Sequence, residues 1–322
     1  MKKLLLVLAL LVPHFAVAQG GDPYPSKTIK VVVPWPAGGS TDNMARIAAQ
    51  RLTVILKQPV IVENRPGATG TLGTLGVIQS PPDGYTLVFM AASLHTFSPH
   101  LLKSMPFDAV ADLTPISNSV QLPYVLLVSA DGPYKTAGEL IKAAKAEPGK
   151  LSYGSFGVGS GPHIATELLR LNAGFEALHV PYKGGSQALA GLMGGQIPFM
   201  FDSLPSAIGQ IRSGRVRPLA VMSPQRSPVL PEVPTLMEQG FNIQGVIWNG
   251  LGGPPNLPQP IVAKLFDAMT RLAVDPEFVK RVADMGAEAI SSKSPAEFRE
   301  FMVKERERWG KVIREAKIPA SD

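Results

Sequence analysis

The sequence contains no cysteine among its 322 residues. This absence excludes a disulfide framework and a thiolate metal site, and it leaves no cysteine to carry a lipid anchor. Long hydrophobic runs are also missing, since no stretch after residue 18 reaches the roughly 20 unbroken apolar residues that a membrane-spanning helix needs. We therefore expect the mature chain to be soluble.

The first eighteen residues have the pattern of an export signal. Positive charges at Lys2 and Lys3 precede an apolar run at 4–12, and residues 16–18 (AVA) suit signal-peptidase cleavage. The apolar run is too short to span a bilayer comfortably. These features predict cleavage after Ala18 and a periplasmic location, free in solution.

Length and charge limit the possible architecture and partners. Removal of the signal leaves 304 of the 322 residues, about twice the usual length of one domain, which predicts two lobes. The formal net charge falls from +6 to +4 when Lys2 and Lys3 are removed, and the other basic residues are scattered. Such a surface does not favour nucleic acid as a partner. The mild positive balance suits anionic solutes without identifying one.

Short β-branched runs alternate with helical patterns along most of the chain, which is typical of a parallel sheet covered by helices. The first unit has expected strands and helices at Ile29–Val33, Asn43–Leu56, Val60–Val62, Leu72–Gln79 and Thr86–Met90. The second has them at Tyr124–Val128, Ala137–Ala146, Leu151–Ser155, Pro162–Leu171, Leu178–Val180, Gln187–Gly194 and Phe199–Phe201. The predicted fold class is α/β, with two lobes that each contain a mixed, mostly parallel sheet flanked by helices.

The C-terminal part is expected to pack on an existing lobe because it has too little strand for a third sheet. Its helical patterns lie at Ile261–Leu272, Glu277–Met285 and Pro295–Ala316. Two extended segments, 113–120 and 241–253, are expected to cross between the lobes. This topology assigns residues 19–118 plus 245–322 to the first lobe and residues 119–244 to the second.

Capping residues mark two helix starts. Thr136 with Glu139, and Ser294 with Glu297, have the spacing of a capping box, in which a hydroxyl oxygen accepts from the N–H three residues on. Pro295 stands at a first helical position, where its missing N–H is not needed. These signals support the helix positions given above.

The most informative stretch is residues 31–46 (VVVPWPAGGSTDNMAR), where an apolar strand, a Pro/Gly turn and a helix start follow one another. A helix N-terminus presents unpaired N–H groups and about half a positive charge, so it favours a bound carboxylate. Gly38 and Gly39 allow a ligand to approach the backbone closely. Asp42 either orders this loop or receives a donor. The alternative is a well-capped turn with no ligand.

The second unit repeats this arrangement at residues 151–169 (LSYGSFGVGSGPHIATELL), and a third turn follows at 180–187 (VPYKGGSQ). In open α/β sheets, ligands bind beyond the carboxyl ends of the strands, where these loops lie. Trp35 and Phe156 stand inside the two main loops and are expected to form walls of a cleft. The alternative is that glycine-rich turns are ordinary features of such a fold.

Asp202 ends an apolar strand and is followed by Ser203. A carboxylate at this position either accepts a hydrogen bond from a ligand or caps the following helix.

The chain has four histidines after the signal, which are His95, His100, His163 and His179. They lack the spacing and the carboxylate neighbours of a zinc site, so each is expected to be a structural or ligand-facing polar group.

Enzyme motifs are absent from the glycine-rich loops. The run 157–162 is not the dinucleotide-binding fingerprint, because Pro162 takes the position of the last glycine or alanine. A nucleophile elbow around Ser160 needs glycine at position 158, where Val158 stands. No phosphate-binding P-loop occurs. We therefore expect a protein that is not an enzyme and has no catalytic residues, cofactor or metal.

Several blocks of this sequence occur together in one known family. They are YPSKTIKVVVPWPAGGSTD, QPVIVENRPGATG, PPDGYTL, HVPYKGGSQAL, GGQIPFMFDSLPSA, LPEVPTLMEQGF and the closing RWGKVIREAKI. Over essentially its whole mature length, the chain resembles the Bug-type extracytoplasmic solute receptors (substrate-binding proteins) of tripartite tricarboxylate transporters. The resemblance implies a two-lobed Venus-flytrap fold like that of type II periplasmic binding proteins. It also implies a carboxylate held by backbone and hydroxyl groups of two glycine-rich loops, with ordered waters. These loops lie within residues 31–46 and 151–169 and are called the two Gly loops below.

The resemblance also assigns residues to the cleft. It places Ala37, Gly38 and Gly39 on the first-lobe side and Ser155, Phe156, Gly157 and Ser160 on the second-lobe side. Ser93 and His95 resemble a family segment that reaches the cleft, and Asp202 resembles an acidic position that meets the far end of the ligand. Val158 departs from the small polar residue common in relatives, which indicates a less polar distal pocket. The complete predicted ligand site is Trp35, Ala37, Gly38, Gly39, Thr41, Asp42, Ser93, His95, Ser155, Phe156, Gly157, Ser160, His163, Asp202 and Ser203.

The expected function is capture of a small carboxylate-containing solute in the cleft between the lobes, followed by delivery to the membrane permease subunits. Ligand binding shifts an open–closed equilibrium only if affinity is higher for the closed state. The alternatives are a ligand-sensing subunit of a membrane signalling system and a periplasmic hydrolase. Mono-, di- and tricarboxylates, aromatic acids and acidic amino acids all fit a backbone-lined site. The chain is expected to work as a monomer.

Overall fold

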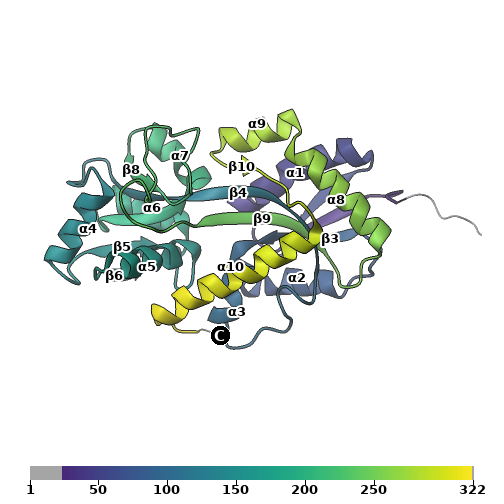
Figure 1. Ribbon diagram of the computed structural model, residues 1–322, viewed down its shortest axis with the longest axis horizontal. Coiled ribbons are helices and arrows are strands. Elements are labelled where there is room, and N and C mark those ends of the chain that lie inside the picture. The colour runs from purple at the N-terminus through teal and green to yellow at the C-terminus, as the bar shows by residue number, and fades with distance from the viewer. Residues whose placement is uncertain (1–23, 321–322) are drawn as a thin grey trace, which may run out of the picture.

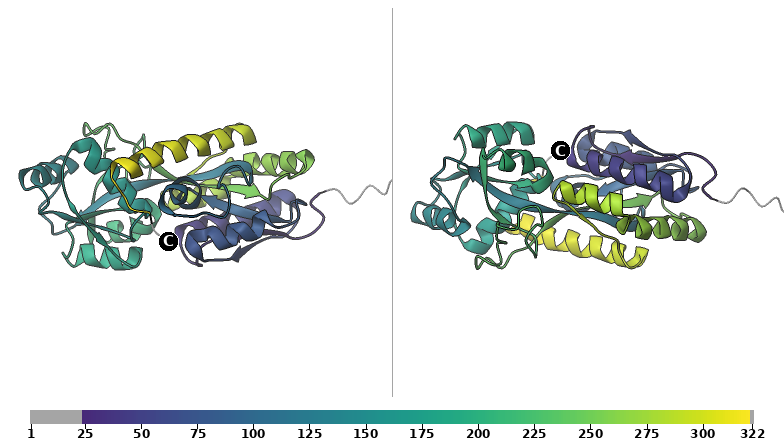
Figure 2. Two further views of the ribbon diagram at one scale, coloured as in Figure 1. Left: turned by 90° about the horizontal axis from the view of Figure 1, so that it is seen from below. Right: turned by 90° about the horizontal axis from the view of Figure 1, so that it is seen from above.

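The structure is a computed structural model in which residues 24–320 are described (Figure 1). The predicted signal peptide at residues 1–18 lies outside the described residues. Within residues 24–320, no helix is both long enough and apolar enough to cross a membrane. The described chain forms two lobes joined by long central strands, as Figure 1 and the two views of Figure 2 show.

The first lobe is built around β1, which pairs in parallel with β2 and β3. β1 reads IKVVV and is buried at four of its five positions, as expected for a strand that helices cover on both faces. The strands of this lobe are β1 (Ile29–Val33), β2 (Val60–Asn64), β3 (Thr86–Ala91) and the short β10 (Glu288–Ala289). Its helices are α1 (Ser40–Leu56), α2 (Thr71–Ile78), α3 (Ser98–Leu101), α8 (Gln259–Ala273), α9 (Pro276–Asp284) and α10 (Pro295–Glu315).

The second lobe repeats this architecture around β5, which pairs in parallel with β6 and β7. Its core includes Tyr153, Phe199 and Phe201, all of them fully buried. The strands of this lobe are β5 (Ser152–Ser155), β6 (Leu178–Pro181), β7 (Phe199–Ser203) and β8 (Val216–Val221). Its helices are α4 (Ala137–Ala146), α5 (Gly161–Ala173), α6 (Gly185–Met193) and α7 (Leu204–Arg212).

Two strands connect the lobes. The first part of β4 (Thr114–Ser129) pairs with β9 (Val246–Gly253), and its last part pairs with β7 and β8. The result is one ten-stranded sheet in the order β2-β1-β3-β9-β4-β7-β5-β6, with β8 and β10 also paired to β4. The segments predicted to cross between the lobes, 113–120 and 241–253, overlap these two strands. The residue boundaries of the two lobes remain a prediction.

Helix α10, which the sequence assigns to the first lobe, also contacts the second lobe. Near its start, Phe298 packs in a cluster with Trp248 of β9. Near its end, Trp309 packs in another cluster with Phe97, which follows β3, and with Ile164 of α5 in the second lobe. The helix has 21 residues and is therefore about 30 Å long, which is enough to reach across the junction seen in Figure 1.

The capping predictions are confirmed. The Glu139 N–H donates to Thr136 Oγ1 at 3.1 Å, and the Glu297 N–H donates to Ser294 Oγ at 3.1 Å. Pro295 lies in the first turn of α10, as expected. Each of these bonds satisfies one N–H that a helix start leaves without an intrahelical acceptor.

Two elements of the second lobe are not predicted by the sequence pattern, namely α7 and β8. β8 contains Pro218, which cannot donate to a strand ladder and makes the segment read as a poor strand. The segment nevertheless pairs with β4 through a register shift. In the first lobe, α1 begins at Ser40, three residues before the predicted Asn43.

Candidate ligand-binding site

The two Gly loops lie at strand ends that point toward each other. β1 runs parallel to β3, while β9 is antiparallel to both β3 and β4, so β1 runs in the direction of β4 toward the second lobe. β5 runs parallel to β7, which is antiparallel to β4, so β5 runs toward the first lobe. The loops that follow β1 and β5 therefore emerge between the lobes. Gly159 of the second loop lies against α3, since a Cβ placed on it would come within 2.7 Å of the Leu101 side chain.

Asp42 holds the first Gly loop from inside helix α1. Its carboxylate accepts from the Gly38 N–H at 2.8 Å, from Arg46 Nε at 3.0 Å and from Asn64 Nδ2 at 2.8 Å. Burial alone disfavours the charged form, but the hydrogen bonds from Arg46, Gly38 and Asn64 outweigh it and lower the pKa of Asp42. Of the two roles left open by the sequence, this geometry supports the ordering of the loop.

The backbone donors of the first loop come from the start of α1. The first helical bond runs from the Asn43 N–H to Gly39 O at 3.0 Å, so the N–H groups of residues 39–42 have no acceptor within the helix. Ala37, Gly38 and Gly39 are exposed, and Thr41 is half-buried. This edge of the loop is therefore open to an anionic group.

Trp35 lies deeper in the same loop. It is half-buried and packs against the first-lobe core, and its carbonyl oxygen accepts from Asn64 Nδ2 at 3.1 Å. A Cβ placed on Gly70 would lie 3.3 Å from the indole ring. The ring is thus fixed in place beside the loop, where the sequence predicts a wall of the cleft.

Ser155 stabilises the second Gly loop through hydrogen bonds of its buried hydroxyl group. Its hydroxyl Oγ is 0% exposed, accepts from the Gly157 N–H at 3.1 Å, and lies 2.9 Å from Gly157 O and 2.6 Å from His179 Nε2. Its hydrogen-bonding capacity is used within the protein. The buried Ser160 Oγ differs, because it has no hydrogen-bond partner among the described residues.

The second loop presents apolar side chains next to its backbone. Val158 is 53% exposed at the tip of the loop. Phe156 is half-buried in the second-lobe core, and its ring packs on Gly185, where an added Cβ would lie 3.1 Å from Cζ. The structure thereby brings the third glycine-rich turn, at 180–187, beside the second loop.

Asp202 lies fully buried at the carboxyl end of β7. Oδ1 accepts from the Ser203 N–H at 2.6 Å, while Oδ2 has no hydrogen-bond partner within residues 24–320. Ser203 is the N-cap residue of α7, and within the described part of the chain no side chain of the cap accepts a hydrogen bond from this helix. Burial raises the pKa of Asp202 to about 7, and hydrogen bonding from Ser203 and from the Ser206 side chain only partly opposes this rise. The bond from Ser203 to Oδ1 leaves Oδ2 without a hydrogen bond among the described residues, and a ligand contact at Asp202 stays a prediction.

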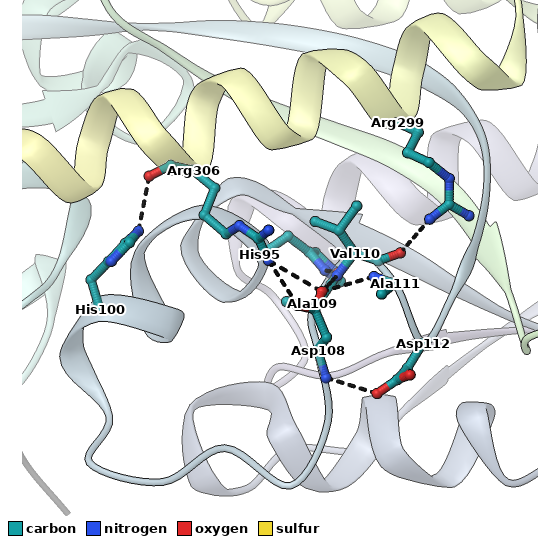
Figure 3. Close-up of polar contacts among 9 residues, drawn as sticks. All are labelled: His95, His100, Asp108, Ala109, Val110, Ala111, Asp112, Arg299 and Arg306. Carbon is teal, nitrogen blue, oxygen red and sulfur yellow. Dashed lines mark hydrogen bonds and ion pairs between the residues drawn. The ribbon is translucent and has the colours of Figure 1, made fainter.

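Ser93 and His95 lie in a π-helical turn, Ser93–Phe97, directly after β3. His95 is fully buried, and Nδ1 lies 2.7 Å from Ala109 O, so Nδ1 carries the proton and Nε2 is an acceptor (Figure 3). Burial lowers the pKa of His95 to about 4. Nε2 has no hydrogen-bond partner among the described residues, and the ring stacks on Trp248 at 6.1 Å.

Helix α10 holds the segment 108–112, which includes the Ala109 carbonyl that is hydrogen-bonded to His95. Arg299 donates to Val110 O at 2.9 Å, and Arg306 pairs with Asp108 at 3.1 Å, as Figure 3 shows. The Asp108 carboxylate also accepts from the Val110 and Ala111 N–H groups at 2.8 Å. The position of His95 therefore depends on the C-terminal helix as well as on the first lobe.

Other candidate chemistry lies elsewhere or is missing from the described part of the chain. Among residues 24–320, no group of three or more histidine, aspartate and glutamate residues is placed to hold a metal ion. A cavity of about 590 Å³ lies beside Gln121 and Pro123 of β4, between segments 223–229 and 273–289. None of the predicted ligand residues lines it, so the candidate site rests on the geometry of the loops.

A family comparison identifies the chain. Residues 44–318 match the family described as the tripartite tricarboxylate transporter family receptor, TctC. The chain belongs to this receptor family.

Related sequences cover nearly the whole receptor. BugT of Bordetella pertussis is 34% identical over 319 residues, which cover 98% of each chain. A UPF0065 protein of Pseudomonas sp. strain P51 is 35% identical over 308 residues, which cover 94% of this receptor and 90% of that relative. The predicted Bug-type resemblance is confirmed.

Solved structures confirm the predicted two-lobed α/β fold. The periplasmic binding protein BugD is 32% identical, with a TM-score of 0.79 over 92% of the receptor and 100% of that chain. An R. palustris protein solved with adipate is 31% identical, with a TM-score of 0.83 over 92% and 100%. MatC from Rhodopseudomonas palustris, with bound malate, is 31% identical, with a TM-score of 0.78 over 90% and 100%. The family and these neighbours are solute receptors, and the receptor is not an enzyme.

Some contacts that shape the receptor's candidate site are not found by sequence reasoning. His179 meets Ser155, and Asn64 meets Asp42, although each pair is more than twenty residues apart. The parallel registers of β5 with β6 and of β1 with β2 create these contacts. Tyr124 of β4 is also missed, and its hydroxyl lies next to Gly161 at the start of α5. Predicting these contacts requires knowing which strands pair and in which register.

Proposed function

We propose that the receptor captures a small carboxylate solute between its two Gly loops and delivers it to permease subunits in the membrane. The observation that carries this proposal is that the loops after β1 and β5 emerge between the lobes, one from each side. Each loop leads into the N-terminus of a helix of more than ten residues, α1 or α5, where free N–H groups favour an anion. The predicted ligand residues of both loops belong to this proposed site, in which Asp42, Ser155 and His163 hold the loop backbones in place.

The ligand class proposed is a dicarboxylate. Adipate and malate, the ligands named for two solved neighbours, both carry two carboxylates. One carboxylate would meet the first turn of α1, and the other would lie toward Asp202, whose raised pKa lets it donate a hydrogen bond. The exposed Val158 and the nearby Phe156 favour a ligand with an apolar segment between its carboxylates.

The delivery step is proposed from the family and from the location of its solved members. BugD, one of the solved neighbours, is a periplasmic binding protein, and residues 1–18 of this chain have the pattern of an export signal. We propose that the receptor works in the periplasm and that ligand binding favours a closed arrangement of the lobes. A ligand produces this shift only through higher affinity for the closed state.

An uptake assay tests delivery. Spheroplasts of the source cells, washed free of periplasmic protein, are expected to regain uptake of radiolabelled dicarboxylate when the purified mature receptor is added. A receptor variant that does not bind the ligand is the matched control and is expected to restore nothing. Uptake that is independent of added receptor, despite tight ligand binding in solution, would contradict delivery and would favour a ligand-sensing role.

A further inference from the structure

Two histidine rings lie stacked beneath the second Gly loop. The ring centroids of His163 and His179 are 3.9 Å apart, and the ring planes differ by 6°. Tyr153 packs beside both rings, at 5.0 Å from His179 and 6.2 Å from His163. His163 belongs to α5 and His179 to β6, so the stack joins the helix that follows the loop to a neighbouring strand.

Each ring is hydrogen-bonded to the loop near a glycine with a positive φ angle. The Gly159 N–H donates to His163 Nδ1 at 2.9 Å. His179 Nε2 lies 2.6 Å from Ser155 Oγ, which accepts from the Gly157 N–H at 3.1 Å. Gly157 and Gly159 have φ angles of +123° and +75°, which side-chain-bearing residues rarely adopt. The stack thus braces the two left-handed positions of the loop.

The bond from Gly159 determines where His163 can gain a proton. Because the Gly159 N–H is a donor, Nδ1 is the unprotonated nitrogen and the neutral ring carries its proton on Nε2. A second proton can go only to Nδ1, where it removes the acceptor and sets two N–H groups against each other. Protonation of His163 and its bond to Gly159 therefore exclude each other.

His179 has no such conflict. Ser155 Oγ can accept from a protonated Nε2 while it donates to Gly157 O, which is 2.9 Å away. A positive charge on His179 would still disfavour one on His163, because the parallel rings lie 3.9 Å apart. The proton sensitivity of the loop therefore lies in His163.

The charged groups around the stack are already paired with one another. Tyr153 of β5 packs against both rings, and Glu167 of α5 acts on both electrostatically, with Arg170 and Glu176 beyond it. Glu167 accepts from Tyr153 Oη at 2.6 Å and from Arg170 Nε at 2.9 Å. Arg170 also pairs with Glu176 at 3.0 Å. Both carboxylate oxygens of Glu167 thus already accept hydrogen bonds, and Glu167 only partly compensates a charge on His163.

We propose that His163 is a positioning residue whose neutral ring keeps the second Gly loop in its ligand-binding shape and whose protonation releases the loop. This inference rests on the proposed function of that loop. It gives His163 a place behind the ligand site, whereas the sequence suggests a residue that lines it. The receptor would then bind its ligand more weakly in acidic surroundings.

The direction of the pH effect follows from the two states of the loop. Burial and the neighbouring His179 lower the pKa of His163 to about 4, and Glu167 only partly opposes this. In the released loop the ring returns toward an ordinary pKa of about 6.5. The released loop therefore binds a proton between these values, so the formed loop is favoured above about pH 6.5 and is lost as the pH falls toward 4. Between pH 7.5 and pH 5, one such group weakens affinity by up to about thirtyfold.

Two variants of the mature receptor test this role. His163→Asn keeps an acceptor near the position of Nδ1 but does not titrate in this range. His163→Phe keeps a flat ring against His179 but removes the acceptor. The first readout needs no ligand: the exchange rate of the Gly159 amide by NMR at pH 7.5 and pH 5, corrected for intrinsic exchange. The second readout is adipate affinity by calorimetry at both pH values.

The expected results separate the inference from the proposed function. In the wild type, the Gly159 amide is expected to be protected at pH 7.5 and to exchange at least about tenfold faster at pH 5. His163→Phe should exchange fast at both pH values, and His163→Asn should be protected at both. Equal protection of Gly159 in the wild type and in His163→Phe at both pH values would overturn the inference.

The calorimetric data carry a control for the ligand itself. Adipate also gains protons near pH 5, and the His163→Asn receptor measures that contribution alone. The wild type is expected to lose more affinity than His163→Asn between pH 7.5 and pH 5, and equal losses would count against the inference. If adipate fails to bind the wild type even at pH 7.5, the proposed function fails for this ligand. The exchange of Gly159 then still decides the role of His163.

Discussion

The replacement Gly39→Val is expected to weaken carboxylate binding by about a hundredfold while the receptor stays folded. Gly39 has φ −74° and ψ 167°, an extended conformation that valine adopts readily, and an added Cβ would meet only Pro36 O, at 3.9 Å. The two methyl groups would stand over the N–H groups that open toward the ligand. Loss of two charge-assisted hydrogen bonds costs about 3 kcal/mol or more, which corresponds to this factor in Kd.

Calorimetry measures the affinity, and thermal unfolding shows that the fold is intact. Gly209→Val is the matched control, because Gly209 is exposed on α7 and an added Cβ meets nothing within 4 Å. That variant is expected to keep wild-type affinity and to gain a few tenths of a kcal/mol of stability, because valine is a better helix former than glycine. Gly38 is a poorer test site, since its φ of +87° would strain any side chain. Wild-type affinity in Gly39→Val would contradict the placement of the ligand at the first Gly loop.

The replacement Gly161→Ala is expected to destabilise the receptor by about 1–3 kcal/mol and to weaken ligand binding. Gly161 is the first residue of α5, and an added Cβ would lie 2.2 Å from Tyr124 Oη and 3.2 Å from Cζ. Tyr124 is 2% exposed on the connecting strand β4, so its ring cannot swing aside into solvent. The clash should push the start of α5, and with it the second Gly loop, away from β4.

A second substitution tests this mechanism. Tyr124→Phe removes the oxygen at 2.2 Å and leaves the ring carbon at 3.2 Å, a distance that small shifts can accommodate. The double variant is therefore expected to recover most of the melting temperature and affinity lost in Gly161→Ala, which a double-mutant cycle quantifies. Additive losses, with no recovery in the double variant, would show that the contact between Tyr124 and Gly161 does not set the loop position.

The alternation of strands and helices is predictable because it depends on local periodicity and on caps. The predicted helix Ala137–Ala146 agrees with α4 at both ends, and the side chain of Thr136 caps its first turn. The two Gly loops are predictable for the same reason, since each combines an apolar strand, a run of glycines and a helix start. Local sequence therefore locates the loops along the chain.

The internal bonding of the loops and the continuity of β4 are not predictable from local sequence. Asn64 reaches Asp42 only because β2 lies beside β1, and no local pattern states that register. β4 contains Pro115 and Pro123, so the sequence pattern predicts separate extended segments, yet the strand runs through all 16 residues. Its pairing with β9 shifts register next to Pro115. Long-range pairing overrides the local signal at these positions.

The central proposal is that a carboxylate is bound between the two Gly loops. A thermal-shift titration of the mature receptor with adipate, malate and their uncharged diamides measures this most directly, because a ligand that binds only the native state raises its melting temperature. At a concentration of about 100 Kd, the stabilisation reaches about 2.7 kcal/mol. We predict a rise of several degrees with at least one diacid and no change with its diamide. Equal shifts for diacid and diamide, or flat curves for a wide panel of carboxylates, would contradict the claim.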